Sequence, residues 1–240
     1  MSLTYAQIIS LATLAAKCPG YTSQAGMICN AVLAQLAQQH DFDIQKVTSF
    51  SVTLNGTTNN GAGPYNLPTD YLRHSENEIN FSVNNVPFIL FQIPIAQWRS
   101  LFLEGTGGAI PVNFATDFST VQTLGFPQAY IYPAPNTAYV VQWPYFKAHA
   151  FVATPETSNA VPWFPDALYL YTKIAYELMK ITDDERAREF KEDARDILQK
   201  YIDLKDDTEG YAFKIQMGQC FRGNFGSLPN AKSLNGGIGW

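Results

Sequence analysis

The chain has 240 residues, a net charge of -5 and only 15% charged residues, while aromatic residues reach 14%. A typical globular protein has about 25% charged residues. Protein interfaces favour Tyr, Trp and Phe and exclude charge, so the composition fits either a chain that buries surface against other subunits or a monomer with an aromatic core. The mildly acidic charge, without a block of Arg and Lys, argues against a dedicated nucleic-acid reader.

The cysteines and the apolar stretches indicate neither zinc binding nor a membrane. Cys18, Cys29 and Cys220 are widely spaced and form no CxxC pair, so we interpret them as reduced thiols. The apolar run 8–16 lacks a preceding basic segment, which argues against a signal peptide. The most apolar stretch, residues 86–98, is interrupted by two prolines and is too short to span a bilayer.

Two helices joined by a short loop are predicted at the N-terminal end. Apolar residues recur at helical spacing over residues 4–17, and Pro19-Gly20 ends this helix. Ser23 is a candidate N-cap for a second helix that runs to about Gln39. The apolar face of this helix is predicted to comprise Met27, Ile28, Ala31, Val32 and Leu36. The short loop predicts an antiparallel pair.

The region from about residue 47 to 150 is predicted to be rich in β-strands. Phe50, Val52 and Leu54 alternate with polar residues, as in a half-buried strand. Another alternating run ends at Asn84-Asn85, which tolerates positive φ and predicts a tight hairpin with residues 86–91. A short helix is expected over residues 94–103. Residues 128–132 and 138–146 are predicted to form a second hairpin around residues 133–136.

The helical pattern returns after residues 162–166. One helix is expected to end near Thr182, with its apolar face marked by Leu168, Tyr171, Ala175 and Leu178. A second helix is expected to start at about Asp183. Its apolar seam comprises Ala187, Phe190, Ala194, Ile197, Tyr201 and Leu204. The seam fits packing on the other helices or a coiled coil, and Arg188–Glu192 and Asp196–Lys200 are expected to pair on the outer face.

Residues 217–240 have a different character from the preceding helices. They combine glycine with large apolar residues and show no helical period. Because flexible linkers are normally polar, this segment predicts an arm that docks onto something; the alternatives are an arm that folds back on its own helices or is disordered. The predicted anchors are Phe221, Arg222, Phe225, Leu228, Leu234, Ile238 and Trp240.

Together these elements predict an α+β fold with the two helix pairs at opposite ends of the chain. We expect an antiparallel helical bundle from residues 1–46 and 160–212, an inserted β-rich domain over residues 47–159, and an extended arm over residues 213–240.

No motif for catalysis or metal binding is found. His40, His74 and His149 each stand alone, without HExxH or similar spacing, and GxSxG is absent. The acidic clusters are best explained as solvated faces or helix ends rather than paired catalytic carboxylates. These clusters are Glu76 with Glu78, Asp183-Asp184-Glu185 and Asp206-Asp207. We therefore expect no enzymatic activity, no cofactor and no metal.

Several segments, taken in chain order, carry a resemblance to one family. They are the N-terminal helix pair, Tyr65-Asn66-Leu67-Pro68-Thr69-Asp70-Tyr71-Leu72-Arg73, Tyr130-Ile131-Tyr132-Pro133-Ala134-Pro135, the strand 139–145, the lead-in 162–166 and the C-terminal helix pair. In this order they resemble the head-to-tail adaptor proteins of tailed bacteriophages, also called connector or head-completion proteins, particularly the tail tubular proteins of short-tailed phages. The resemblance covers about residues 1–205.

The resemblance implies a structural virion protein without catalytic activity. Such a protein forms a twelvefold ring of neighbouring copies on the portal protein, in the neck or tail of a virion assembled in the host cytoplasm. It helps to retain packaged DNA, which passes through the ring without sequence-specific binding, and it docks tail nozzle or fibre proteins. The family's C-terminal segment commonly reaches onto the portal, so the resemblance assigns the arm to portal binding; no membrane is involved.

Two other functional classes are compatible with the residues. A receptor- or carbohydrate-binding tail module would use Trp98, Trp143 and nearby tyrosines to stack on sugar rings. A cell-wall-degrading tail enzyme would need a carboxylate pair of the kind that the sequence does not single out.

Overall fold

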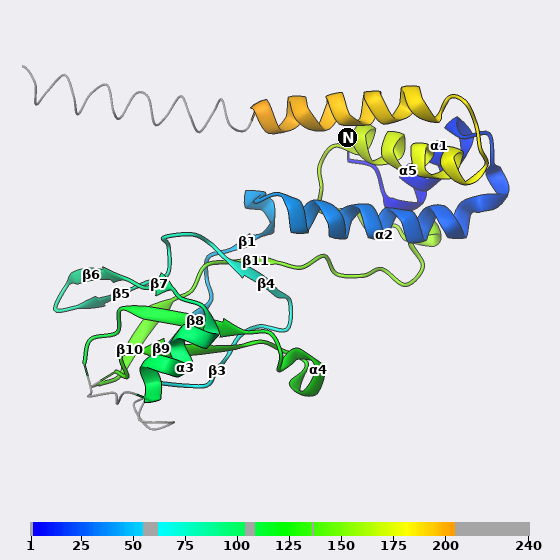
Figure 1. Ribbon diagram of the computed structural model, residues 1–240. Helices are drawn as coiled ribbons and strands as arrows, with labels where there is room; N and C mark the ends of the chain where they lie inside the picture. The colour runs from blue at the N-terminus through cyan, green and yellow to red at the C-terminus, as the bar shows by residue number, and fades with distance from the viewer. Residues whose placement is uncertain (1, 55–61, 104–108, 136, 205–240) are drawn as a thin grey trace, which may run out of the picture.

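The computed structural model describes residues 2–54, 62–103, 109–135 and 137–204 (Figure 1). As predicted, the protein is α+β, with helices towards both ends of the described chain and strands between them. None of the helices in these ranges has the length and hydropathy that a membrane span requires. The arm predicted over residues 213–240 lies outside the described residues.

The N-terminal helices are present, but their ends differ from the prediction. α1 (Tyr5–Ala15) begins at a capping box in which Thr4 Oγ1 accepts from the backbone of Gln7, 3.3 Å away, and Thr4 N donates to Gln7 Oε1 at 3.0 Å. The 3-10 helix η1 (Pro19–Tyr21) follows, so Pro19-Gly20 lies between the helices. α2 (Thr22–Gln39) starts before Ser23, whose predicted role as N-cap is therefore wrong.

The predicted apolar face of α2 is rotated relative to the observed one. Val32 and Leu36 are buried as predicted and Ile28 packs against the core, but Met27 is 60% exposed and Ala31 is also exposed. Cys29 and Leu33, which the prediction left out, are completely buried. The reason is that α2 packs against α1, α5 (Ala167–Ile181) and the 3-10 helix η4 (Pro155–Thr157) together. The helical period cannot fix the phase of a helix in which apolar residues also flank the expected face.

The C-terminal helices confirm the predicted pair with two corrections. Asp166 caps α5 by accepting from Tyr169 N at 3.0 Å, and Leu168, placed on the apolar face by the sequence, is 47% exposed. The second helix spans residues 187–204 rather than starting at 183. Asp183 has a φ of 53°, and Asp184 accepts from Arg186 N at 3.0 Å, so these acidic residues form the turn before the helix.

A single apolar core joins α1, α2, α5 and the helix of residues 187–204. It contains Ile8 of α1, Leu33 of α2, Ile174 of α5 and Ala194 of the last helix. The predicted seam packs against this core, except Leu204, which is 73% exposed. The seam therefore packs on the neighbouring helices. On the outer face Arg188 pairs with Glu192 at 3.3 Å, while Asp196 and Lys200 form no ion pair among the described residues.

The β-rich region, which lies below the helices in Figure 1, contains three small sheets. The first has the order β1 (Lys46–Val47), β11 (Tyr145–Lys147), β4 (Tyr71–His74), and the second β2 (Ser51–Leu54), β10 (Tyr139–Gln142), β5 (Asn80–Val83), β6 (Val86–Ile89). The third has the order β3 (Tyr65–Asn66), β9 (Gln128–Tyr132), β8 (Asn113–Asp117), β7 (Phe91–Gln92). Their shared core includes the fully buried Trp143.

Two local predictions in this region are confirmed and one is wrong. Asn84 and Asn85 have φ values of 51° and 65° and join β5 to β6 in the predicted hairpin. The helix expected over residues 94–103 is α3 (Ile95–Leu103), and a one-turn helix, α4 (Val121–Leu124), follows later. The predicted second hairpin does not form, because β9 pairs with β8 and β3 whereas β10 pairs with β2 and β5. Pro133 and Pro135 supply no N–H, so they cannot continue a ladder between them.

Arg73 of β4 connects the β-rich region to the C-terminal end of α2. Its guanidinium donates to the carbonyls of Ala37 (2.9 Å), Gln38 (3.2 Å) and His40 (2.8 Å), and its Nε donates to Asp41 Oδ1 at 2.6 Å. The last carbonyls of a helix have no partner inside the helix and carry partial negative charge. One cation from the sheet therefore caps the helix that leads into it.

Candidate functional site

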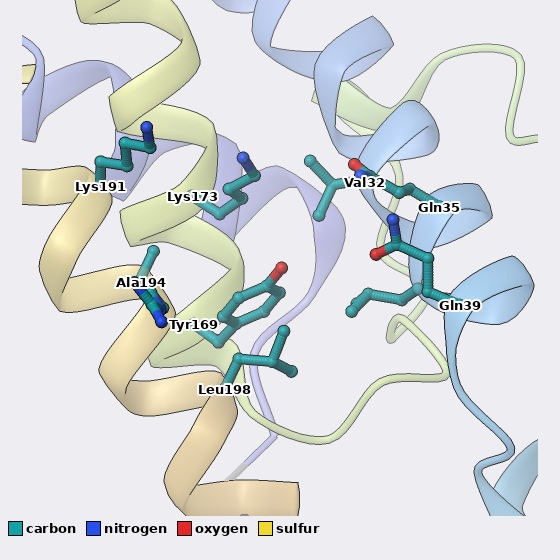
Figure 2. Close-up of a pocket in the computed structure, with 10 residues that line it drawn as sticks. Val32, Gln35, Gln39, Tyr169, Lys173, Lys191, Ala194 and Leu198 are labelled. Carbon is teal, nitrogen blue, oxygen red and sulfur yellow. The ribbon is translucent and has the colours of Figure 1, made fainter.

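A groove of about 220 Å³ lies where α2, α5 and the helix of residues 187–204 meet (Figure 2). Its floor includes Leu36 and Ala194, each 2% exposed, so the base of the groove is part of the helical core. The polar rim comprises Gln35 and Gln39 of α2, Tyr169 and Lys173 of α5, and Lys191 and Arg195 of the last helix. We call this surface the basic groove.

The three cations of the basic groove are not equivalent. Lys173 Nζ donates to Glu177 Oε1 at 2.8 Å and lies 4.7 Å from the centroid of the Tyr176 ring, so its charge is engaged within α5. Lys191 and Arg195 are exposed, and neither forms an ion pair with any residue in the described ranges. These two residues, one helical turn apart, leave uncompensated positive charge on a chain whose net charge is -5.

A second groove, of about 430 Å³, lies on the opposite flank of the same helix, against α1 and α5. It is lined by the apolar side chains of Leu168, Phe190 and Ile197, by the carboxylates of Asp193 and Asp196, and by one cation, Lys200, which leaves one net negative charge. Both carboxylates are exposed and form no ion pair in the part of the chain that the structure describes. We call this surface the acidic groove.

A larger cavity, of about 520 Å³, lies between the helices and the β-rich region. Gln45, Trp163 and His149 are among the residues that line it. Within the described residues, the buried atoms Gln45 Oε1 and Trp163 Nε1 have no hydrogen-bond partner. Buried polar atoms of this kind are commonly satisfied by ordered water, so the cavity is best explained as a hydrated junction between the two parts of the protein.

The histidines and cysteines occupy structural positions. Burial lowers the pKa of His40, His74 and His149, which favours the neutral imidazole. His74 packs edge-on against Phe114, with 5.1 Å between ring centroids. Cys18 and Cys29 are free and buried, and burial raises the pKa of Cys29 to about 12, so its thiol is a poor nucleophile. Cys220 lies outside the described residues.

One carboxylate of each acidic cluster in the described ranges forms a local ion pair. Glu78 pairs with Lys46 at 2.6 Å, and Asp184 pairs with Arg186 at 2.6 Å. Hydrogen bonds from Arg186 lower the pKa of Asp184 to about 2, so this carboxyl has the opposite of the raised pKa that a general acid needs. Among the described residues no three His, Cys, Asp or Glu side chains are placed to hold a metal ion. Asp206 and Asp207 lie outside the described residues.

The tryptophans proposed to stack on sugar rings are not available for it. Trp143 is completely buried, and Trp98 is 6% exposed with its Nε1 donating to the carbonyl of Ile131 at 3.0 Å. Trp98 also stacks on Phe102 within the protein, with 4.9 Å between ring centroids. A sugar-binding role for this pair of residues is therefore wrong.

The structure does not place the predicted arm residues. Phe221, Arg222, Phe225, Leu228, Leu234, Ile238 and Trp240 all lie outside the described residues. Conversely, the sequence interpretation did not single out the two grooves. A helical wheel of the sequence separates the charges, because Lys191 and Arg195 lie on one flank of the helix and Asp193 and Asp196 lie on the other. The contributions of α2 and α5 to the grooves had no local signal.

Comparison with known proteins gives one decisive match. No curated protein matches the chain. The family model described as SU10 adaptor protein matches residues 3–214, which covers both helix pairs and the whole β-rich region. The match agrees with the phage head-to-tail adaptor resemblance drawn from the segments between residues 1 and 205, and a structural adaptor suits a protein of the virion. The chain therefore belongs to the SU10 adaptor protein family.

Proposed function

We propose that this protein is a head-to-tail adaptor that forms a ring of twelve copies beneath the portal and joins it to the tail. The observation that carries the proposal is the family match over residues 3–214. The low content of charged residues and the abundance of aromatic residues support a chain that works in an assembly. In this role the ring helps to retain packaged DNA and docks nozzle or fibre proteins on its distal face.

In this proposal the two parts of the protein have separate tasks. The helices of residues 1–46 and 160–212 act as an antiparallel bundle that packs beside the neighbouring copies, and residues 47–159 act as an inserted β-rich domain. The separate apolar cores of the helices and of the sheets support this division. The Arg73 contacts with the end of α2 would keep the domain in a fixed orientation on the bundle.

The third task, attachment to the portal, belongs in this proposal to the arm of residues 213–240. An arm loses roughly 1–2 kcal/mol of backbone conformational entropy per residue when it docks. It must therefore bury several large side chains, each contributing about 1.5–3 kcal/mol. Phe221, Phe225, Ile238 and Trp240 supply the largest apolar groups for this purpose.

The test is a truncation after Gly218, measured for portal binding and for thermal unfolding. We expect the truncated chain to unfold at nearly the same temperature as the full chain and to lose portal binding. The matched pair within the full chain is Phe225→Ala/Trp240→Ala against the polar control Asn224→Ala/Ser233→Ala, of which only the first should weaken binding. Full-affinity binding by the truncated chain would reject the arm as the anchor, and failure of the truncated chain to fold would place the arm in the core.

A further inference from the structure

We propose that the basic groove of one copy receives the acidic groove of the next copy, so that the helix of residues 187–204 forms the contact that closes the ring. The inference rests on the proposed function, because it names the surface through which neighbouring copies of the adaptor meet. It assigns the two exposed cations of one copy, Lys191 and Arg195, to the exposed carboxylates of its neighbour, Asp193 and Asp196.

The placement of the two charge pairs fits a head-to-tail contact. On a helix of 3.6 residues per turn, the mean direction of Lys191 and Arg195 lies about 150° from that of Asp193 and Asp196. Lys200 lies on the same flank as the two carboxylates, which outnumber it. The two flanks therefore point in nearly opposite directions. A ring is built from heterologous contacts, in which each copy presents two different surfaces that face its two neighbours. A ring with many copies needs those surfaces on nearly opposite sides of each subunit.

The surfaces also have the apolar content that a stable contact requires. In the acidic groove, Leu168 is 47% exposed and lies beside the partly buried Phe190 and Ile197. In the basic groove, the partly buried Leu198 supplies the apolar surface, because Val32 is only 4% exposed. Rim charges then select orientation and partner around an apolar centre. Within the described chain the four charged residues have no ion-pair partner, so a neighbour can pair them without breaking an existing contact.

The experiment uses full-length protein and charge reversal of each flank. The first variant is Lys191→Glu/Arg195→Glu, the second is Asp193→Lys/Asp196→Lys, and the third carries all four changes and so exchanges the two flanks. The control is Lys17→Glu/Lys147→Glu, which reverses two cations that lie outside both grooves and form no ion pair within the described chain. The number of copies bound per portal is measured by native mass spectrometry, and association without portal by sedimentation velocity at low and high salt.

We expect the wild type, the control and the four-residue exchange to fill the portal. Each single-flank variant should bind portal through its arm but leave the ring incomplete, with association between copies weakened by about 10-fold or more. In an equimolar mixture of the two single-flank variants, the first carries acidic residues on both flanks and the second carries basic residues on both flanks. The two variants should therefore associate with each other at low salt, and high salt should weaken this association. In a mixture of isotope-labelled and unlabelled wild-type protein, a carbodiimide cross-linker should form an amide bond between Lys191 of one copy and Asp193 or Asp196 of another. The label shows that the bond joins two different copies.

The outcomes separate this inference from the proposed function. If wild-type protein does not bind portal at all, the proposed function fails, and the sedimentation and cross-linking results still decide whether the two grooves meet. If the single-flank variants fill the portal like the wild type, the inference is overturned while the adaptor role stands. If only the loss of Lys191 and Arg195 matters and the four-residue exchange does not restore the ring, the basic groove contacts DNA or another protein, and the inference is overturned.

Discussion

Replacing Arg73 by Met should separate the β-rich region from the end of α2. Met keeps most of the aliphatic packing but removes the donors to the carbonyls of Ala37, Gln38 and His40. A hydrogen bond from a charged donor contributes about 1.5–3 kcal/mol when well buried. The Arg73 side chain is 29% exposed, so each bond is discounted for solvent screening. We therefore expect a loss of about 2–4 kcal/mol in the free energy of unfolding.

Arg73→Lys provides the matched comparison. Lys retains the charge but has a single ammonium group, which cannot reach three diverging carbonyls as the planar guanidinium does. We expect this variant to lose about half as much stability as Arg73→Met. Asp41→Asn is the second control, because the Asp41 side chain is 56% exposed and its pairing with Arg73 should contribute less than about 1 kcal/mol.

Urea unfolding followed by far-UV circular dichroism and by tryptophan fluorescence measures both parts of the protein. The dichroism is dominated by the helices, and in a Trp163→Phe/Trp240→Phe background the two remaining tryptophans, Trp98 and Trp143, both lie in the β-rich region. In Arg73→Met the fluorescence transition should move to lower urea than the dichroism transition, because the junction no longer couples the two cores. A loss below about 0.5 kcal/mol in Arg73→Met, or a loss in Asp41→Asn as large as that in Arg73→Met, would refute the capping account.

Three further measurements test the interior. Phe42→Ala should cost about 3–5 kcal/mol in urea unfolding, because Phe42 is buried and contacts the rings of Trp163, Phe164 and Tyr201; a loss below about 1 kcal/mol would contradict its central place. Burial lowers the pKa of His149, so the unfolded chain binds more protons as the pH falls below about 6.5, and stability should decrease between pH 7.5 and 5.5. His149→Gln should make that decrease smaller, and the remainder should come from His40 and His74, whose pKa values burial also lowers; an unchanged slope would reject the assignment to His149. Gly26→Val should lower the melting temperature, because a Cβ at Gly26 would lie 2.9 Å from Glu156 Oε2 and 3.3 Å from Pro155 Cδ; an unchanged temperature would show that η4 can move away from α2.

The sequence predicted elements well where the signal was local. The Asn84-Asn85 hairpin, α3 and the four long helices all follow from turn chemistry or from apolar spacing within the segment itself. The phase of α2 and the pairing of β9 and β10 depend on contacts with distant segments. Tyr139 pairs with Leu54, for example, and the local sequence around neither residue predicts this strand pairing.

The same distinction applies to the functional surfaces. Lys191 and Arg195 could have been recognised as a charged flank from their spacing, but the groove exists only because α2 and α5 bring Gln35 and Tyr169 beside them. Arg73 lies in a segment that carried the family resemblance, yet its carbonyl partners are 33 to 36 residues earlier in the chain. Side chains that act across an interface between elements leave no periodic signal in the sequence.

The most direct test of the adaptor role is an electron micrograph of the purified chain mixed with its cognate portal. The account predicts class averages in which a ring of twelve copies lies coaxially beneath the portal, with the helix of residues 187–204 at the contacts between neighbours. Portal particles without added density, or copies bound without rotational symmetry, would contradict it.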